Sequence, residues 1–208
     1  MLAIVDYGVG NLFSLQSCLK RINQEVVVTK DPEVLTAAER IILPGVGAFG
    51  DAAAKLRQGG LDKLLCRLAG EGKPPLGICL GMQLLFEKSY EYGEHEGLGL
   101  IKGKIVPINQ VVPDNIKVPH MGWNALHITR PHPLLQYVKE GDFVYFVHSY
   151  FGYECAHSTI ATAEYGAELT AAVAEGNVMG CQFHPEKSGA VGARILQAFM
   201  EMKAGQAW

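Results

Sequence analysis

A cysteine between two glycines is the residue of this sequence best suited to covalent chemistry. Gly77 and Gly81 each stand two positions from Cys79 in the stretch "GICLGMQLLF", which gives the pattern G-x-C-x-G. In the serine form of this pattern, a sharp strand-to-helix turn holds the nucleophile exposed, and the glycines leave room for neighbouring elements. A helix starting after Cys79 would also favour its thiolate. The alternative is a small buried cysteine that fills a tight turn.

A thiol nucleophile needs a general base, and the stretch "CQFHPEKS" offers His184 for that role. Glu186, two positions further on, could fix the tautomer of the imidazole and stabilise its protonated form. The alternative is an ordinary exposed turn after a strand. Taken together, the two stretches predict a Cys79–His184–Glu186 triad.

A third stretch could stabilise the negative charge that an attack by Cys79 creates. "PGVGAFG", residues 44–50, follows an apolar run, and its glycines let backbone N–H groups turn toward a developing oxyanion. A proline–glycine turn before a helix is the plainer interpretation. All three stretches follow expected strands, and the carboxyl ends of parallel strands face one crevice, so we expect them to meet there.

The elements that must position these residues alternate in the first half of the chain. Short β-rich runs predict strands at 2–8, 25–29, 40–45 and 74–79, and helical spacing predicts helices at 11–22, 51–72 (with a break at 59–60) and 80–89. Such alternation indicates parallel βαβ units with helices on both faces of the sheet. The second half predicts short, partly antiparallel strands at 97–108, 125–129, 142–151, 159–165 and 178–184, and a closing helix at 189–204. We therefore expect one α/β domain over residues 1–208, built on a mostly parallel sheet with added antiparallel strands.

Composition narrows the class of protein. The 208 residues are 49% hydrophobic and 19% charged, with a net charge of −3, an ordinary globular balance without the basic surface of a nucleic-acid binder. No apolar run is long enough to span a bilayer, and the first residues do not resemble a signal peptide. The five scattered cysteines indicate free thiols in a reducing compartment, so we expect a cytoplasmic protein.

Other polar residues carry weaker signals. Cys181 and His184 have C-x-x-H spacing without a second ligand pair, and the remaining histidines are dispersed, so no metal or other cofactor is expected. His120 and His148 are expected to be structural or cavity-lining residues. Residues 90–96 are expected to form an exposed acidic loop without chemistry. Gly8 and Gly10 begin a dinucleotide-binding pattern that Phe13 leaves incomplete.

The motifs also carry a resemblance to a known family. "GICLGMQ" together with "FHPE" is similar to the class I, triad-type glutamine amidotransferases, and "PGVGAFG", "VPHMGWN" and "FVHSYF" resemble the glutaminase subunits of imidazole glycerol phosphate synthases within it. The motifs extend from Asp6 to about Ser188. The resemblance implies a three-layer, flavodoxin-like sandwich and the hydrolysis of glutamine to glutamate and ammonia through a thioester on Cys79.

The same resemblance implies roles for single residues. His184 would transfer the protons, with Glu186 orienting it. The N–H groups of Leu80 and of the 44–47 loop would hold the oxyanion. The expected oxyanion and glutamine-binding residues are Val46, Gly47, Leu80, Gln83, Ser149 and Tyr150.

The implied partner is a cyclase subunit with a βα-barrel, which uses the ammonia to make imidazole glycerol phosphate and an aminoimidazole carboxamide ribonucleotide in histidine biosynthesis. The residues that match the family's interface are Asn11, Trp123, Tyr145 and Lys187. We further hypothesise that the 44–47 loop switches when the partner binds, since glycine permits peptide rotation. The alternatives are a glutaminase of anthranilate, GMP or pyridoxal phosphate synthesis, an inactive binding subunit, and a free-standing cysteine hydrolase.

Overall fold

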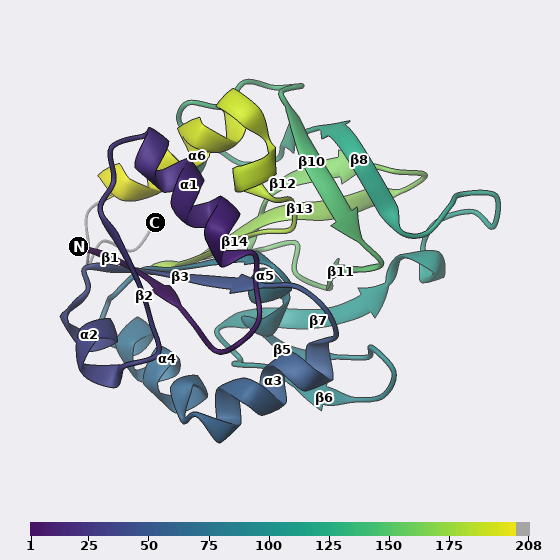
Figure 1. Ribbon diagram of the computed structural model, residues 1–208. Coiled ribbons are helices and arrows are strands. Elements are labelled where there is room, and N and C mark those ends of the chain that lie inside the picture. The colour runs from purple at the N-terminus through teal and green to yellow at the C-terminus, as the bar shows by residue number, and fades with distance from the viewer. Residues whose placement is uncertain (203–208) are drawn as a thin grey trace.

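An eight-stranded sheet runs through the middle of the molecule (Figure 1) in the computed structural model, which describes residues 1–202. Its strand order is β2 (Val26–Thr29), β1 (Leu2–Val5), β3 (Arg40–Gly45), β4 (Pro75–Cys79), β14 (Val178–Cys181), β13 (Glu168–Glu175), β12 (Thr159–Glu164) and β9 (His127–Ile128). Neighbours from β2 to β14 are parallel, and β13, β12 and β9 continue the sheet antiparallel. The expected mostly parallel sheet with antiparallel additions is confirmed.

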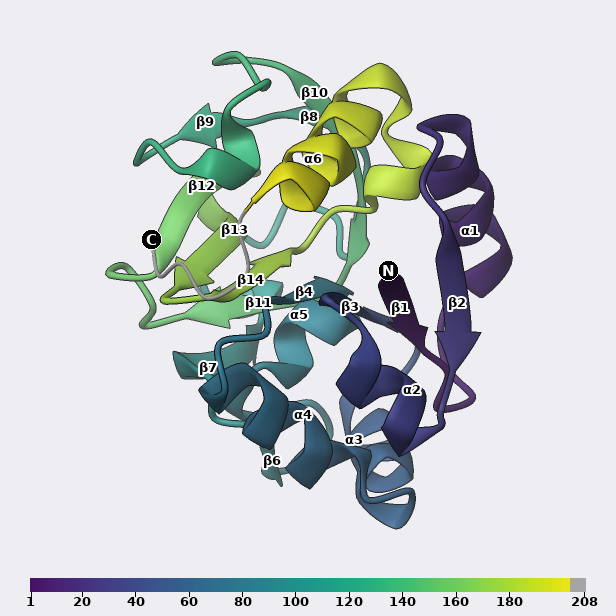
Figure 2. The same cartoon turned by 90° about the vertical axis from the view of Figure 1, so that its left-hand side faces the viewer.

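Helices cover both faces of this sheet, as the alternation of buried side chains requires. Leu2 and Ile4 of β1 join one core cluster, and Ala3 and Val5 join the cluster on the opposite face. One face carries α1 (Leu12–Arg21) and α6 (Gly189–Glu201), and the other carries α2 (Pro32–Ala37), α3 (Phe49–Gln58), α4 (Leu61–Gly70) and α5 (Leu80–Leu84) (Figure 2). Within residues 1–202, every helix is too short or too polar to cross a membrane.

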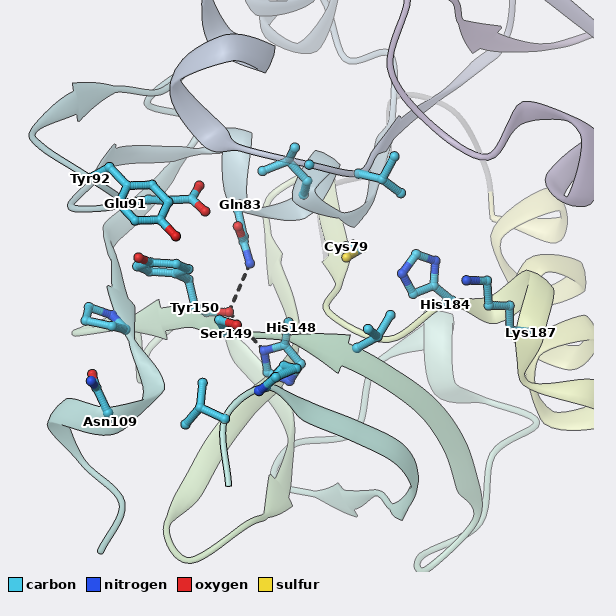
Figure 3. A pocket seen from close by; sticks show the side chains of 17 residues that line it. Cys79, Gln83, Glu91, Tyr92, Asn109, His148, Ser149, Tyr150, His184 and Lys187 are labelled. Carbon is cyan, nitrogen blue, oxygen red and sulfur yellow. Dashed lines mark hydrogen bonds between the residues drawn. The ribbon is translucent and has the colours of Figure 1, made fainter. Parts of the chain in front are cut away.

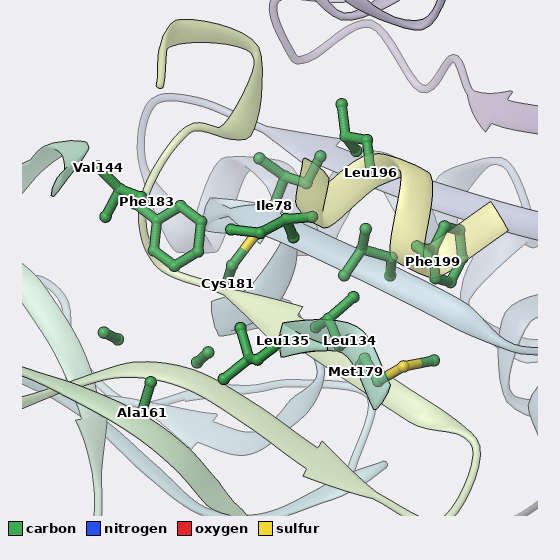
Figure 4. Packing of buried hydrophobic residues seen from close by; sticks show 14 of the residues in the cluster. Ile78, Leu134, Leu135, Val144, Ala161, Met179, Cys181, Phe183, Leu196 and Phe199 are labelled. Atoms are coloured by element: carbon green, nitrogen blue, oxygen red, sulfur yellow. The ribbon is translucent and has the colours of Figure 1, made fainter. Parts of the chain in front are cut away.

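The core beneath α6 ties the site-bearing strands to the rest of the fold (Figure 4). Ile78 of β4 packs with Cys181 and Phe183 at the end of β14, and with Leu196 and Phe199 of α6. These side chains are almost fully buried. Close packing on this face therefore fixes the segments that carry Cys79 and His184.

Two smaller sheets extend the fold on the side of the antiparallel strands. One pairs β10 (Phe143–His148) with β8 (His120–Ala125). The other has the order β11 (Tyr150–Tyr153), β7 (Ile101–Pro107), β5 (Phe86–Ser89) and β6 (His95–Glu96). Single 3-10 turns, η1 (Ile108–Gln110), η2 (Pro133–Leu135) and η3 (Pro185–Lys187), complete the described elements.

The expected helix over 80–89 is wrong in its second half. Helix α5 ends at Leu84, and Phe86–Ser89 is strand β5, which pairs in parallel with β7 and antiparallel with β6. The carbonyl oxygens of Leu85 and Phe86 accept bonds from residues 99–101 instead of continuing a helix. Tertiary pairing thus overrides a local sequence without a helix breaker.

Other boundaries also differ. The expected strand over 142–151 is two strands in different sheets, separated at Ser149, and the expected strand over 178–184 ends at Cys181. The sequence patterns did not indicate β8, β13 or α2. The closing helix is confirmed to Glu201, and positions 203–204 of the expected helix lie outside the described residues.

Candidate active site

Cys79 occupies a strained turn between β4 and α5. Its φ of 54° and ψ of −114° lie where residues with a side chain are rarely found. A Cβ on Gly81 would lie 1.8 Å from the Leu43 carbonyl oxygen, and one on Gly77 would lie 2.6 Å from the backbone of Met82. The expected need for glycine at both positions is confirmed. Helix α5 begins at the residue after Cys79 but has only five residues, so its macrodipole is small.

His184 and Glu186 form a buried pair beside Cys79. His184 lies just beyond β14, and Glu186 lies in η3, which begins at the next residue. The Nδ1 atom of His184 and the Oε1 atom of Glu186 are 2.8 Å apart, with side chains 2% and 3% exposed. The opposite ring atom, Nε2, is buried and hydrogen-bonds to no group of residues 1–202. The ring lines the same cavity as Cys79 (Figure 3), so Nε2 is the atom available for the thiol proton.

The electrostatics of the pair favour a protonated imidazole. Burial by itself lowers the pKa of His184, but the Cys79 sulfur and the Glu186 carboxylate outweigh burial and raise this pKa to about 9. Cys18 of α1 lies close behind the pair, and burial, followed by the charge of Glu186, raises its pKa. The carboxylate that stabilises the charged His184 ring therefore disfavours the thiolate of Cys18.

A cavity of about 470 Å³ extends from the triad into the molecule. Cys79, His184 and Lys187 lie at one end, the rings of Tyr92 and Tyr150 lie with Glu91 at the other, and Gln83 lies between them (Figure 3). The cavity walls bring together most of the residues predicted from sequence: Val46, Gly47, Cys79, Leu80, Gln83, Ser149, Tyr150, His184 and Lys187. Glu186 lies behind the His184 ring, and Asn11 reaches only a small void of about 10 Å³ beside Glu186.

Gln83 connects the cavity wall to the nucleophile. Its Nε2 atom donates to the Tyr150 carbonyl and to Oε1 of Gln182, each at 3.0 Å. Gln182 in turn directs its own Nε2 toward the Cys79 sulfur at 3.8 Å. Both N–H groups of Gln83 are thus committed, which leaves its Oε1 for a ligand. Sequence reasoning missed Gln182, for which its place two residues before His184 was the available signal.

The end of β3 is anchored, and the loop that follows it is open. The Tyr7 hydroxyl donates to the Pro44 carbonyl at 2.8 Å. A Cβ on Gly45 would lie 2.7 Å from the backbone nitrogen of Gly81, whereas one on Gly47 would meet no atom within 4 Å. Val46 between them is partly exposed. The Val46 peptide therefore has room to rotate about a fixed starting point.

The expectation of an exposed acidic loop without chemistry at 90–96 is wrong for Glu91. Glu91 is only 9% exposed, and its carboxylate accepts a 2.5 Å bond from the Phe49 N–H at the start of α3. Burial raises its pKa, and it lines the far end of the cavity. The stretch contains three glutamates, Glu91, Glu94 and Glu96, so residue type alone could not separate the buried Glu91 from the two exposed ones. A carboxylate here suits a cationic group of a ligand.

Exposed aromatic and apolar residues surround the triad end of the cavity. Trp123 and Tyr145, on paired strands, meet edge to face at 6.1 Å, and the Lys187 Nζ lies 5.7 Å from the centre of the Tyr145 ring. Trp123 and Met121 are both more than half exposed. Asn11 caps α1 through its side chain. Such a surface is typical of protein interfaces.

Comparisons with known proteins agree with this geometry. The family model described as "Glutamine amidotransferase class-I" matches residues 3–202. The imidazole glycerol phosphate synthase subunit HisH of Geobacillus sp. (strain WCH70) is 50% identical, with 99% of each chain covered. The protein of the same name from Sulfurimonas denitrificans is 48% identical, with 98% of this chain and 99% of the relative covered.

Solved structures share the fold at lower identity. A crystal structure of a glutamine amidotransferase superimposes with a TM-score of 0.75 at 19% identity, covering 96% of this chain and 97% of the other. PurLQS from Thermotoga maritima gives a TM-score of 0.72 at 23% identity, covering 96% of each. The strained cysteine, the buried histidine–glutamate pair and the full-length relatives all indicate the same family. The chain belongs to the class I glutamine amidotransferases, among the HisH subunits of imidazole glycerol phosphate synthase.

Proposed function

We propose that this chain hydrolyses glutamine to glutamate and ammonia and passes the ammonia to a cyclase subunit of imidazole glycerol phosphate synthase. The observation that carries the proposal is the buried His184–Glu186 pair, whose free Nε2 faces the cavity that holds Cys79. The full-length relatives named as HisH subunits support the choice of partner and of histidine biosynthesis. The oxyanion loop "PGVGAFG" favours this synthase over the glutaminases of anthranilate, GMP or pyridoxal phosphate synthesis.

In the first half of the reaction, the Cys79 sulfur attacks the carboxamide carbon of glutamine. His184 already carries the thiol proton on Nε2 before the attack, in keeping with its raised pKa, and Glu186 holds this imidazolium through Nδ1. The carboxamide oxygen becomes an oxyanion, for which the N–H groups of Leu80 and Val46 are the donors. His184 then gives its proton to the leaving nitrogen, the carbon–nitrogen bond breaks, and ammonia departs from a thioester on Cys79.

In the second half, water resolves the thioester. His184 removes a proton from the water as it attacks the carbonyl carbon, and the same two N–H groups hold the second oxyanion. The carbon–sulfur bond breaks, the sulfur leaves as a thiolate beside the protonated His184, and glutamate is released. In each turnover His184 loses one proton to the leaving nitrogen and gains one from water. The buried Glu186 stabilises the charged form of the ring.

The far end of the cavity binds the amino-acid part of glutamine. Glu91 pairs with the α-ammonium group, because a buried carboxylate is a strong partner for a cation. Gln83 accepts through its remaining oxygen, and the Ser149–Tyr150 segment lies along the substrate.

The surface around the triad end receives the cyclase subunit. Trp123, Tyr145 and Lys187 form one connected group there, and Asn11 lies on the other side of the triad. Lys187 directly follows Glu186 in the chain, so a partner that binds Lys187 acts on the residue next to the triad. Ammonia then leaves toward the partner and not into solvent.

The first test measures glutamate released from glutamine by the chain alone, and by its complex with the cyclase subunit and the nucleotide ligand, with Cys79→Ala as the blank. Low activity in the free chain and a large increase in the complex are expected. Equal rates in both states indicate a free-standing hydrolase and remove the partner from the proposal. No glutamate release in any state would indicate that the chain is an inactive binding subunit.

A second test identifies the nucleophile directly. A glutamine-analogue alkylating agent should modify Cys79 and leave Cys18 and Cys66 unmodified, which peptide mass spectrometry distinguishes. Modification spread over all three cysteines would contradict specific activation of Cys79. The single domain over residues 1–208 and the cytoplasmic location stay predictions.

A further inference from the structure

Two buried histidines and a partly buried asparagine outside the triad form a hydrogen-bonded chain that ends at the cavity wall. Nδ1 of His148 lies 2.9 Å from the Tyr150 carbonyl oxygen, and Nε2 of His148 lies 3.0 Å from Nδ1 of His120. Nε2 of His120 lies 3.2 Å from Nδ2 of Asn124. The two histidines are 6% and 2% exposed. We call this chain, Asn124–His120–His148, the histidine relay.

The partners at each end fix where every proton of the relay lies. Asn124 cannot turn its amide over, because Nδ2 also donates to the Glu164 carbonyl at 2.8 Å and Oδ1 accepts from the Ala125 N–H at 2.8 Å. Nδ2 therefore donates to His120, whose Nε2 must be an acceptor. His120 then carries its proton on Nδ1 and donates it to His148.

The same reasoning fixes the second ring. Nε2 of His148 accepts from His120, and Nδ1 of His148 donates to the Tyr150 carbonyl, since a carbonyl oxygen can only accept. Both histidines are thus neutral and protonated on Nδ1. Burial, which lowers the pKa of His120 to about 4 and that of His148 to about 3, agrees with the neutral state. All hydrogen bonds of the relay point one way, from β8 toward the cavity.

Packing holds the relay in place. The His120 ring is stacked between Phe146, at 4.6 Å, and Tyr165, at 4.1 Å between ring centres. His148 is tilted against Phe146 at 5.6 Å. Aromatic contacts on both faces leave the His120 ring little freedom to rotate away from its two hydrogen bonds.

The relay ends at the carbonyl that also holds Gln83. The Tyr150 carbonyl oxygen accepts from His148 at 2.9 Å and from Gln83 at 3.0 Å, so both of its acceptor positions are filled (Figure 3). The preceding carbonyl, of Ser149, accepts from the Ile108 N–H at 2.9 Å. The segment that joins β10 to β11 is therefore held from two sides, with its carbonyl oxygens directed into the protein.

We propose that Asn124, His120 and His148 are positioning residues for glutamine hydrolysis, which orient the Ser149–Tyr150 segment and Gln83 for the amino-acid end of the substrate. This inference rests on the proposed function for its kinetic test. The three residues do not touch the reacting atoms. Loss of the relay therefore weakens substrate binding more than it slows the chemical steps.

The test compares His120→Leu with His120→Asn in the complex with the cyclase subunit. Asparagine places an N–H donor near the position of the lost Nδ1, whereas leucine offers none. Losing one buried hydrogen bond corresponds to about a tenfold effect, so KM for glutamine should rise about tenfold in His120→Leu, with kcat changed less than threefold. His120→Asn should recover most of the loss. Val144→Ala, a buried change on the neighbouring strand β10 outside the relay, should lower thermal stability and leave KM unchanged.

A second measurement needs no variant that could fail to fold. Nitrogen-15 NMR of the wild-type chain at pH 7.5 should show two histidines protonated on Nδ1 and unprotonated on Nε2, the tautomer that the relay requires. Either of these two rings protonated on Nε2 would overturn the proposal, as would an unchanged KM in His120→Leu or no recovery in His120→Asn. An inactive wild-type complex would instead contradict the proposed function, and the NMR result would still decide whether the relay exists.

Discussion

The hydroxyl of Tyr7 donates a 2.8 Å hydrogen bond to the carbonyl of Pro44, which joins the loop after β1 to the end of β3. The two segments also approach each other at Gly10, where a Cβ would lie 3.0 Å from the Pro44 side chain. Pro44 stands two residues before Val46, the proposed oxyanion donor. Burial, followed by the charge of Cys79, raises the pKa of Tyr7, so its hydroxyl remains a donor at any working pH.

Replacing Tyr7 with phenylalanine should lower kcat for glutamine hydrolysis about fivefold, because one buried hydrogen bond of roughly 1 kcal/mol no longer fixes the start of the oxyanion loop. KM should change little, since Tyr7 lies outside the cavity walls. Tyr137→Phe is the matched control, because it removes a hydroxyl that bonds to Glu201 outside the cavity. Equal loss in both variants would assign the effect to general stability.

Glycine at position 79 should give an inactive protein that is more stable than the Cys79→Ala variant. Alanine keeps the strain of a positive φ, whereas glycine relieves roughly 1–3 kcal/mol of this strain. Glycine also destabilises the folded state by about 0.5–1 kcal/mol, because it loses more conformational freedom on folding. The expected gain is about 1 kcal/mol, or about 2–4 °C in Tm for a chain of this length. Thermal unfolding of the two inactive variants measures it. A lower Tm in Cys79→Gly would mean that the turn is not strained.

Replacing Glu91 with glutamine should raise KM for glutamine about 10- to 100-fold and leave kcat near its wild-type value. The carboxamide can still accept from the Phe49 N–H but lacks the charge that pairs with the α-ammonium group, an interaction of about 1.5–3 kcal/mol. Glu94→Gln removes a charge from the same loop at an exposed site that pairs with Lys88. Similar KM values for the two variants would show that only the net charge of the loop matters.

The ring of His184 should stay protonated up to a pH of about 9 in the resting enzyme. NMR titration of the wild-type chain measures this pKa, and Cys79→Ala should lower it, because the sulfur is one of the two groups that favour the charged ring. Glu186→Gln should lower it as well. A value near 6.5 in the wild-type chain would contradict the coupling between Cys79 and His184.

The raised pKa of His184 also links stability to pH. The folded chain holds a proton that an unfolded histidine releases near pH 6.5, so this contribution is complete below pH 6.5 and is lost as the pH rises through 9. The unfolding free energy should therefore fall over that range. In Cys79→Ala the pKa of His184 in the folded chain should be lower, so the contribution should be lost at a lower pH. Urea unfolding at pH 6, 7.5 and 9 compares the two chains.

Strong local patterns made most of the parallel half of the fold predictable. The strands ending at Gly45 and Cys79 and the helix break at Gly59–Gly60 follow from apolar runs and glycines that act locally. The segment 86–89 was misread because its residues carry no helix breaker, and only pairing with β7 makes it a strand. Strand β13 is rich in alanine, which favours helices, yet it lies buried between β12 and β14.

Some residues of the site could likewise be predicted from the sequence, and others could not. Cys79, His184 and Glu186 could be found because their residue types, glycine spacing and places after strands all indicate one chemistry. Glu91 could not, because its role depends on which residues the fold brings beside it. Gln182 had only its place two residues before His184 as a signal. Ser149 separates two strands that belong to different sheets, and no feature of the run "DFVYFVHSYF" indicates that change.

The alternation of side chains along β8 has a consequence for how the enzyme can be altered. Met121 and Trp123 point outward from this strand, and His120 and Asn124, on the alternate positions, take part in the relay. One six-residue strand therefore serves recognition on its outer face and substrate affinity on its inner face. Selection for a new cyclase partner that shifts this strand will change KM for glutamine as well, so partner choice and substrate affinity are expected to evolve together in this chain.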